Sequence, residues 1–127
     1  MPARERDEAA DLIVSALGRT LADARGRWIL KNTHRDARSE LALTGIAAGS
    51  LRSVVIDRSF VDEEGTRWVI DYKTSRHEGA GLEEFLASEL ERYRPQLSTY
   101  QALARELGPE PVRAALYFPL LSAFREL

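Results

Sequence analysis

The sequence contains no cysteine, only two lysines and no long apolar run, and each shortage excludes a class of protein or site. Without cysteine there is no disulfide framework, no zinc ribbon and no cysteine-bound iron–sulfur cluster. No apolar run approaches the roughly 20 residues that a membrane-spanning helix needs, and no signal-peptide pattern opens the chain. We therefore expect a cytoplasmic protein with no membrane partner. The formal net charge of −2 predicts weak nonspecific affinity for nucleic acid.

The length of 127 residues predicts a single domain over 1–127, because it is sufficient for one core and too short for two. Apolar spacing predicts an amphipathic helix over 5–25, ended by Gly26 and followed by a polar connector over 31–38. Pro95 does not fit an uninterrupted helix, so one helix is expected to end near Leu90 and a second to begin near Arg92. The segments predicted from these patterns are strands over 40–47, 51–61, 66–74 and 112–118, a loop over 75–81, and helices over 82–90 and 92–107.

The predicted order αβββαβ indicates a mixed α/β fold, in which a central mixed β-sheet is flanked by helices. Two of its strand patterns each contain one aspartate. Val54-Val55-Ile56 precedes Asp57, and Val69-Ile70 precedes Asp71. An ionised group that leaves water costs several kcal/mol unless it is paired or binds a metal, so these aspartates predict a functional site.

The polar segment 62–66 between these strands is typical of a β-hairpin loop. If the hairpin is symmetric about Glu64, Asp57 and Asp71 lie opposite one another, with Cβ atoms about 4.5–5.5 Å apart. Two carboxyls this close raise the pKa of one of them unless a cation lies between them. Lys73 follows Asp71 by two residues, so the strand period places its ammonium group on the same face.

Oxygen ligands of this kind suit Mg²⁺ or Mn²⁺, and the backbone carbonyl of Tyr72 is a further candidate ligand. A divalent ion at paired carboxylates activates water and neutralises charge on a phosphoryl oxygen, while a lysine orients the water. The pattern therefore predicts phosphodiester hydrolysis.

These residues resemble the PD-(D/E)-x-K nuclease superfamily, and within it the RecB and AddA type of nuclease domain at the C-terminal end of UvrD-like helicases. Ile56-Asp57-Arg58 is similar to the first acidic motif, and the segment 69–75 is similar to the second. Tyr93-x-x-Gln96-Leu97-x-x-Tyr100 resembles the Gln-x-x-x-Tyr helix, and Glu40 resembles an upstream acidic residue of the site. The segment 116–119 is similar to the strand after that helix, so the likeness covers about 39–120.

The resemblance implies a restriction-endonuclease-like core and a Mg²⁺-dependent deoxyribonuclease that cuts single-stranded DNA in repair and recombination, associated with the nucleoid. Its partners would be DNA, a helicase portion of a longer chain and a second helicase–nuclease subunit. The roles it implies are metal binding by Asp57 and Asp71 with help from Glu40, activation of water by Lys73, and support of the site by Gln96 and Tyr100.

The subfamily carries a metal-binding histidine on an early helix, and the predicted helix 5–25 has none. We therefore expect the chain to be a piece of a larger helicase–nuclease, with this histidine upstream of Met1 and reduced activity in isolation. His34 and His77 are the only histidines, and neither has the expected context.

Several alternatives remain open at this point. Tyr93 and Tyr100 have the spacing of residues that pack on a sheet, and Arg58, Arg67 and Arg76 are either phosphate contacts or solvated and paired side chains. An inactive nuclease-fold module that binds DNA or serves as a scaffold is the main functional alternative. A restriction-type endonuclease dimer is a further one, although the chain has no recognition insertion.

Overall fold

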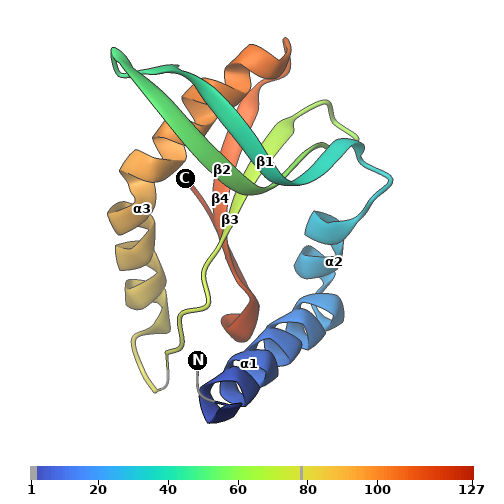
Figure 1. Cartoon of the computed structure of the whole chain (residues 1–127), viewed down its shortest axis with the longest axis vertical. Coiled ribbons are helices and arrows are strands. Elements are labelled where there is room, and N and C mark those ends of the chain that lie inside the picture. The colour runs from blue at the N-terminus through green and yellow to red at the C-terminus, as the bar shows by residue number, and fades with distance from the viewer. Residues whose placement is uncertain (1–2, 78) are drawn as a thin grey trace.

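A five-stranded mixed sheet, in the order β1-β2-β3-β4-β5, forms the centre of the computed structural model, which describes residues 3–77 and 79–127 (Figure 1). Strands β3 and β4 are parallel, and the other neighbouring strands are antiparallel. The elements are α1 (Ala3–Ala22), α2 (Ala24–Leu30), β1 (Arg35–Ala47), β2 (Ser50–Val61), β3 (Arg67–Tyr72), α3 (Leu82–Ala104), β4 (Val112–Phe118) and β5 (Ala123–Glu126), with 3-10 turns η1 (Arg105–Leu107) and η2 (Pro119–Leu121). The predicted mixed α/β fold is confirmed.

Helices cover both faces of this sheet. On one face α3 packs over an aliphatic core that includes Val69, Leu97 and Leu116. On the other face α2 contributes Ile29 to an aromatic cluster with Phe60 and other rings. Figure 1 shows α3 on one side of the sheet and α1 with α2 on the other. None of the described helices is long and apolar enough to cross a membrane.

The β2–β3 hairpin has the predicted loop and register. The backbone N–H of Asp62 donates to the carbonyl of Thr66 at 2.9 Å, and Gly65 adopts a left-handed φ of 82° that favours glycine. The paired residues run from Val61 opposite Arg67 to Arg58 opposite Ile70. Asp57 and Asp71 are the next residues along the two strands, as predicted.

The single N-terminal helix predicted over 5–25 is wrong, because α1 ends at Ala22 and a second helix follows. Asp23 caps α2 by accepting a hydrogen bond from the N–H of Gly26 at 3.2 Å. Gly26 lies inside α2 and does not end it. A Cβ at Gly26 would lie 2.2 Å from the carbonyl oxygen of Thr20, so this glycine permits a close approach of α2 to α1.

The predicted break at Pro95 is also wrong, because α3 is continuous from Leu82 to Ala104 with Pro95 inside it. Pro95 is exposed, so the carbonyl that loses its helical partner can be hydrated. The buried face of α3 includes Leu86, Leu97 and Leu103. Burial of each such side chain contributes about 1.5–3 kcal/mol, which together outweighs the roughly 3 kcal/mol cost of an internal proline.

Strand boundaries differ from the prediction at several points. Strand β1 begins at Arg35, inside the segment expected to be a connector, and β5 was not predicted because four residues carry too little pattern. Strand β3 ends at Tyr72, so Lys73 lies just beyond it. Val55, expected in a buried central strand, is 55% exposed because the tip of the β1–β2 hairpin extends beyond β3.

Candidate active site

The candidate site forms where β2 and β3 separate. Beyond the pair of Arg58 and Ile70 the ladder ends, and the side chain of Asp57 takes the place of the next backbone acceptor. Asp57 Oδ2 accepts a hydrogen bond from the backbone N–H of Tyr72 at 2.8 Å. This contact fixes the Asp57 carboxylate beside the end of β3.

Asp71 lies almost entirely out of water, with 5% of its surface exposed. Burial raises the pKa of the Asp71 carboxyl to about 6; Lys73 opposes this rise, and the neighbouring Asp57 carboxyl adds to it. The two carboxyl groups are therefore close enough to interact. The pKa rise predicted for a pair of adjacent aspartates is found at Asp71.

Lys73 completes the cluster from the first position after β3. Its backbone N–H donates to the carbonyl of Tyr117 at 2.9 Å, which keeps the chain extended and its side chain on the side of Asp71. Lys73 Nζ lies 2.9 Å from Asp71 Oδ2 and 3.7 Å from the centroid of the Tyr93 ring. The ammonium group is thus held between a carboxylate and an aromatic face.

Helix α3 supplies the remaining neighbours of this cluster. Gln96 Nε2 donates to the hydroxyl oxygen of Tyr100 at 2.7 Å. Burial raises the pKa of Tyr100, the hydrogen bond from Gln96 lowers it, and the charges of Asp71 and Asp57 raise it further. Tyr100, with Gln96 bonded to it, therefore lies close enough to the carboxylates to be affected by their charges.

Tyr93 is the site neighbour that the sequence reasoning missed, since only packing was expected of it. Its spacing of three and seven residues from Gln96 and Tyr100 was the available signal, because it places all three on one face of a helix.

The sequence also matches the model of a known protein family. The sequence model of the PD-(D/E)XK nuclease superfamily matches residues 2–125, nearly the whole chain. The chain belongs to the PD-(D/E)XK nuclease superfamily. A search of curated proteins found no match. Members of the superfamily are generally phosphodiester-hydrolysing nucleases that use divalent metal ions, whereas the RecB and AddA subtype stays a prediction.

The carboxylates fit part of the metal site typical of this superfamily. Asp71 Oδ2 is buried and, apart from its ion pair with Lys73, has no hydrogen-bond partner in the described structure. Asp57 uses Oδ2 for the backbone of Tyr72, which leaves Oδ1 available. Two hard carboxylate oxygens suit Mg²⁺ or Mn²⁺, and the Tyr72 carbonyl remains a predicted further ligand.

The structure does not bring the other candidate ligands into the cluster. Glu40 lies between the pairing partners of Arg58 and Ile56, which places its backbone across from Asp57, but its side chain is exposed and makes no described contact with the site. His34 Nε2 donates to the carbonyl of Trp28, and His77 Nε2 donates to that of Ala80. Within residues 3–77 and 79–127, no group of three or more His, Cys, Asp or Glu side chains is placed to hold a metal.

Two of the three candidate phosphate-binding arginines have structural roles. Arg58 donates hydrogen bonds to the carbonyls of Ile29 and Lys31 at the end of α2. Arg67 pairs with Asp36 at 2.7 Å. The expectation of an arginine paired with an acid is met by Arg67 and Asp36. Contact with phosphate or exposure to solvent does not fit Arg58 and Arg67, because both are buried, whereas Arg76 is exposed.

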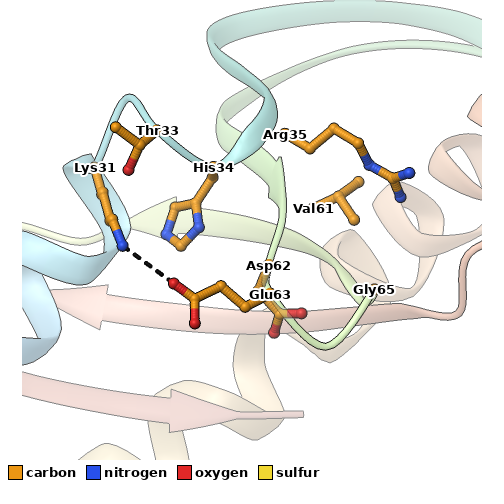
Figure 2. Close-up of a pocket in the computed structure, with 8 residues that line it drawn as sticks. All are labelled: Lys31, Thr33, His34, Arg35, Val61, Asp62, Glu63 and Gly65. Carbon is orange, nitrogen blue, oxygen red and sulfur yellow. Dashed lines mark hydrogen bonds and ion pairs between the residues drawn. The ribbon is translucent and has the colours of Figure 1, made fainter.

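A pocket of about 510 Å³ lies away from these groups, at the β2–β3 turn (Figure 2). Figure 2 shows the ion pair of Lys31 with Glu63, whose atoms lie 3.3 Å apart, beside the ring of His34. The pocket is lined by Lys31, Thr33, His34, Arg35, Val61, Asp62, Glu63 and Gly65. It contains none of the predicted site residues, so the reaction is not assigned to it.

Proposed function

We propose that this chain is a metal-dependent DNA nuclease domain of the RecB and AddA type, which cuts single-stranded DNA and is coupled to a helicase in repair and recombination. The observation that carries the proposal is the convergence of Asp57, Asp71 and Lys73 where β2 and β3 separate. Membership of the PD-(D/E)XK nuclease superfamily supports the reaction class.

The residues of the cluster have complementary roles in this proposal. Asp57 and Asp71 would hold Mg²⁺ or Mn²⁺, and the chemistry supplied by such an ion when bound would be an activated water and neutralised charge on the phosphate. Lys73, positioned by Asp71 and the Tyr93 ring, donates a hydrogen bond that orients the attacking water or stabilises the phosphoryl oxygen. Gln96 and Tyr100, which are hydrogen-bonded to each other, support the cluster from α3.

The weak overall charge of −2 supports a need for assisted delivery of the DNA. A helicase portion of a longer chain, with a second helicase–nuclease subunit, would supply the single strand at high local concentration. This part of the proposal rests on the resemblance of the motifs around Asp57, Asp71 and Gln96 to those of the RecB and AddA nucleases.

The decisive experiment compares the two lysines of the chain. The purified protein is incubated with labelled single-stranded DNA and Mn²⁺ or Mg²⁺, and cleavage is followed on gels. Lys73→Ala is expected to reduce the rate by at least about a hundredfold, since it removes a donor aimed at developing charge. Lys31→Ala is the matched control, because Lys31 is 46% exposed and pairs with Glu63 at the hairpin turn. Equal cleavage by the two variants would reject the role of Lys73.

The main alternative, an inactive scaffold or DNA-binding module, is favoured by one observation. The described structure provides only the two carboxylates of Asp57 and Asp71 where a full ligand set would have more. Calorimetric titration with Mn²⁺ separates the two functions. A nuclease requires a binding site that is lost in Asp57→Ala and Asp71→Ala but kept in Asp11→Ala, whereas an inactive module need bind no Mn²⁺.

A further inference from the structure

A basic pocket of about 460 Å³ lies beyond the loop that follows Lys73. Figure 1 shows that this loop, η2 and α1 share the end of the molecule opposite the tip of the β1–β2 hairpin. The residues that line the pocket are Ser15 and Arg19 of α1, Arg76 and His77 of the loop, and Leu120 and Leu121 of η2.

Among the described residues, the two arginines of this pocket form no ion pair, unlike several other arginines. Arg35 and Arg113, for example, form ion pairs with nearby glutamates. Arg19 donates only to the carbonyl of Leu120, at 3.2 Å, and exposed Arg76 takes part in none of the ion pairs of the described residues. The described lining also contains no acidic side chain, and Asp11 lies one helical turn away from Ser15. Two guanidinium groups that have no acidic partner among the described residues therefore face one concave surface.

The loop wall of the pocket is held in place by His77. The His77 ring stacks on Phe85 with centroids 4.8 Å apart and planes 15° apart, and its Nε2–H donates to the carbonyl of Ala80 at 2.9 Å. These contacts tie the loop to the first turn of α3. A loop that is anchored next to Arg76 loses less conformational entropy on binding a charged group than an unanchored loop.

The pocket is close to the candidate active site along the chain. Arg76 follows Lys73 by three residues, so at most about 11 Å of extended chain separates their Cα atoms. Lys73 faces Tyr93 of α3, whereas Thr74 lies among residues of α1. The loop thus carries the reactive lysine on one side and leads directly to the basic pocket on the other.

We propose that this pocket binds a backbone phosphodiester of the single-stranded nucleic acid, a few nucleotides from the bond that is cut, through Arg19 and Arg76. This inference rests on the proposed function, and it supplies a local contact for a substrate that the chain as a whole attracts weakly. Guanidinium groups suit the pocket because they bind phosphate oxygens in a bidentate manner.

The test measures binding without cleavage. A fluorescein-labelled oligothymidylate is titrated with the full chain in EDTA, and fluorescence anisotropy is recorded over a series of salt concentrations. The double variant Arg19→Ala/Arg76→Ala is expected to bind about tenfold more weakly. Its plot of log affinity against log salt should be shallower by about 1.4, because each single-strand phosphate contact contributes about 0.7 to the slope.

The matched control is Arg52→Ala/Arg105→Ala, which removes two exposed arginines that also form no described ion pair. This control should retain the wild-type affinity and slope. The double variant Arg19→Gln/Arg76→Gln removes both charges but keeps long polar side chains, so it should lose the same slope, which covers the case that the alanine variant fails to fold. An unchanged slope in the alanine variant, an equal loss in the control, or no binding by the wild type would each overturn the inference.

The outcome is distinguishable from failure of the proposed function. Cleavage by the wild type together with an unchanged slope in Arg19→Ala/Arg76→Ala would reject the pocket and leave the nuclease assignment standing. The opposite result is a wild type that binds no Mn²⁺ and cuts no DNA, together with a shallower salt slope in Arg19→Ala/Arg76→Ala. This result would support the pocket and reject the nuclease assignment.

Discussion

Arg58 and Lys73 are two cations that follow the site aspartates Asp57 and Asp71 along the chain, and the structure provides them with different partners. Arg58 is 5% exposed and donates to two carbonyls and to the Ser39 hydroxyl. Lys73 has an ion pair with Asp71 and an aromatic ring beneath it, and its other hydrogens have no described acceptor. A cation whose hydrogen-bond donors all have partners within the protein stabilises the fold, whereas a cation with free donors can bind a substrate.

The largest effect is expected when Asp71, the partner of Lys73, loses its charge. Asp71→Asn is expected to lower the rate of metal-dependent DNA cleavage by about a thousandfold, because charge stabilisation by a bound divalent ion is worth several kcal/mol. Gel assays at saturating Mn²⁺ measure the effect, with Asp11→Asn as the control on exposed α1. A rate within a factor of about two of wild type would contradict the assignment of Asp71.

The next largest difference is expected in stability. Arg58→Ala should lower the free energy of unfolding by about 3 kcal/mol, since it leaves buried carbonyls without partners. Lys73→Ala should lower it by less than about 1 kcal/mol at pH 5, because Asp71 can take up a proton there. Urea denaturation followed by circular dichroism measures both values. A larger loss for Lys73→Ala than for Arg58→Ala would reverse the two roles.

The stability of the folded protein is expected to depend on pH through the Asp71 carboxyl group. The folded protein binds the Asp71 proton more tightly than the unfolded chain, whose carboxyl has the ordinary pKa of 3.8. Without metal, the stabilisation is present below about pH 4 and is lost as the pH rises to about 6 and above, by an amount on the order of 2 kcal/mol. Asp71→Asn should remove this loss of stability with rising pH. The measurement is the difference in the free energy of unfolding between wild type and Asp71→Asn, recorded in EDTA as a function of pH. A difference that does not change between pH 4 and pH 7 would show that Asp71 is not perturbed.

The smallest expected effect concerns the ring beneath Lys73. Tyr93→Leu should lower the cleavage rate about fivefold, because a cation–π contact of about 1 kcal/mol no longer positions the ammonium group. Tyr93→Phe keeps the aromatic face and should retain nearly the full rate. A similar loss in both variants would mean that the tyrosine hydroxyl, and not the ring, supports the site.

The sequence predicted the part of the molecule where local rules are strong. The hairpin loop 62–66 and the spacing of Asp57, Asp71 and Lys73 follow from turn chemistry and the strand period, so the register and the cluster were predictable. Gly26 and Pro95 were misinterpreted because packing of α2 and α3 outweighs their local preferences. The structural role of Arg58 could not be predicted, because its acceptors lie 27 and 29 residues away along the chain.

The hydrogen bond between Asp57 and the backbone of Tyr72 gives this aspartate a structural role in addition to its proposed metal-binding role. The side chain of Lys73 has no such structural role. Removal of Asp57 leaves the Tyr72 amide without its acceptor where β2 and β3 separate, so both the stability of the fold and the cleavage activity are lost. Lys73 can be lost with little harm to the architecture. In a related protein that has lost nuclease activity but still folds, the residue equivalent to Lys73 is therefore expected to be substituted before the residue equivalent to Asp57.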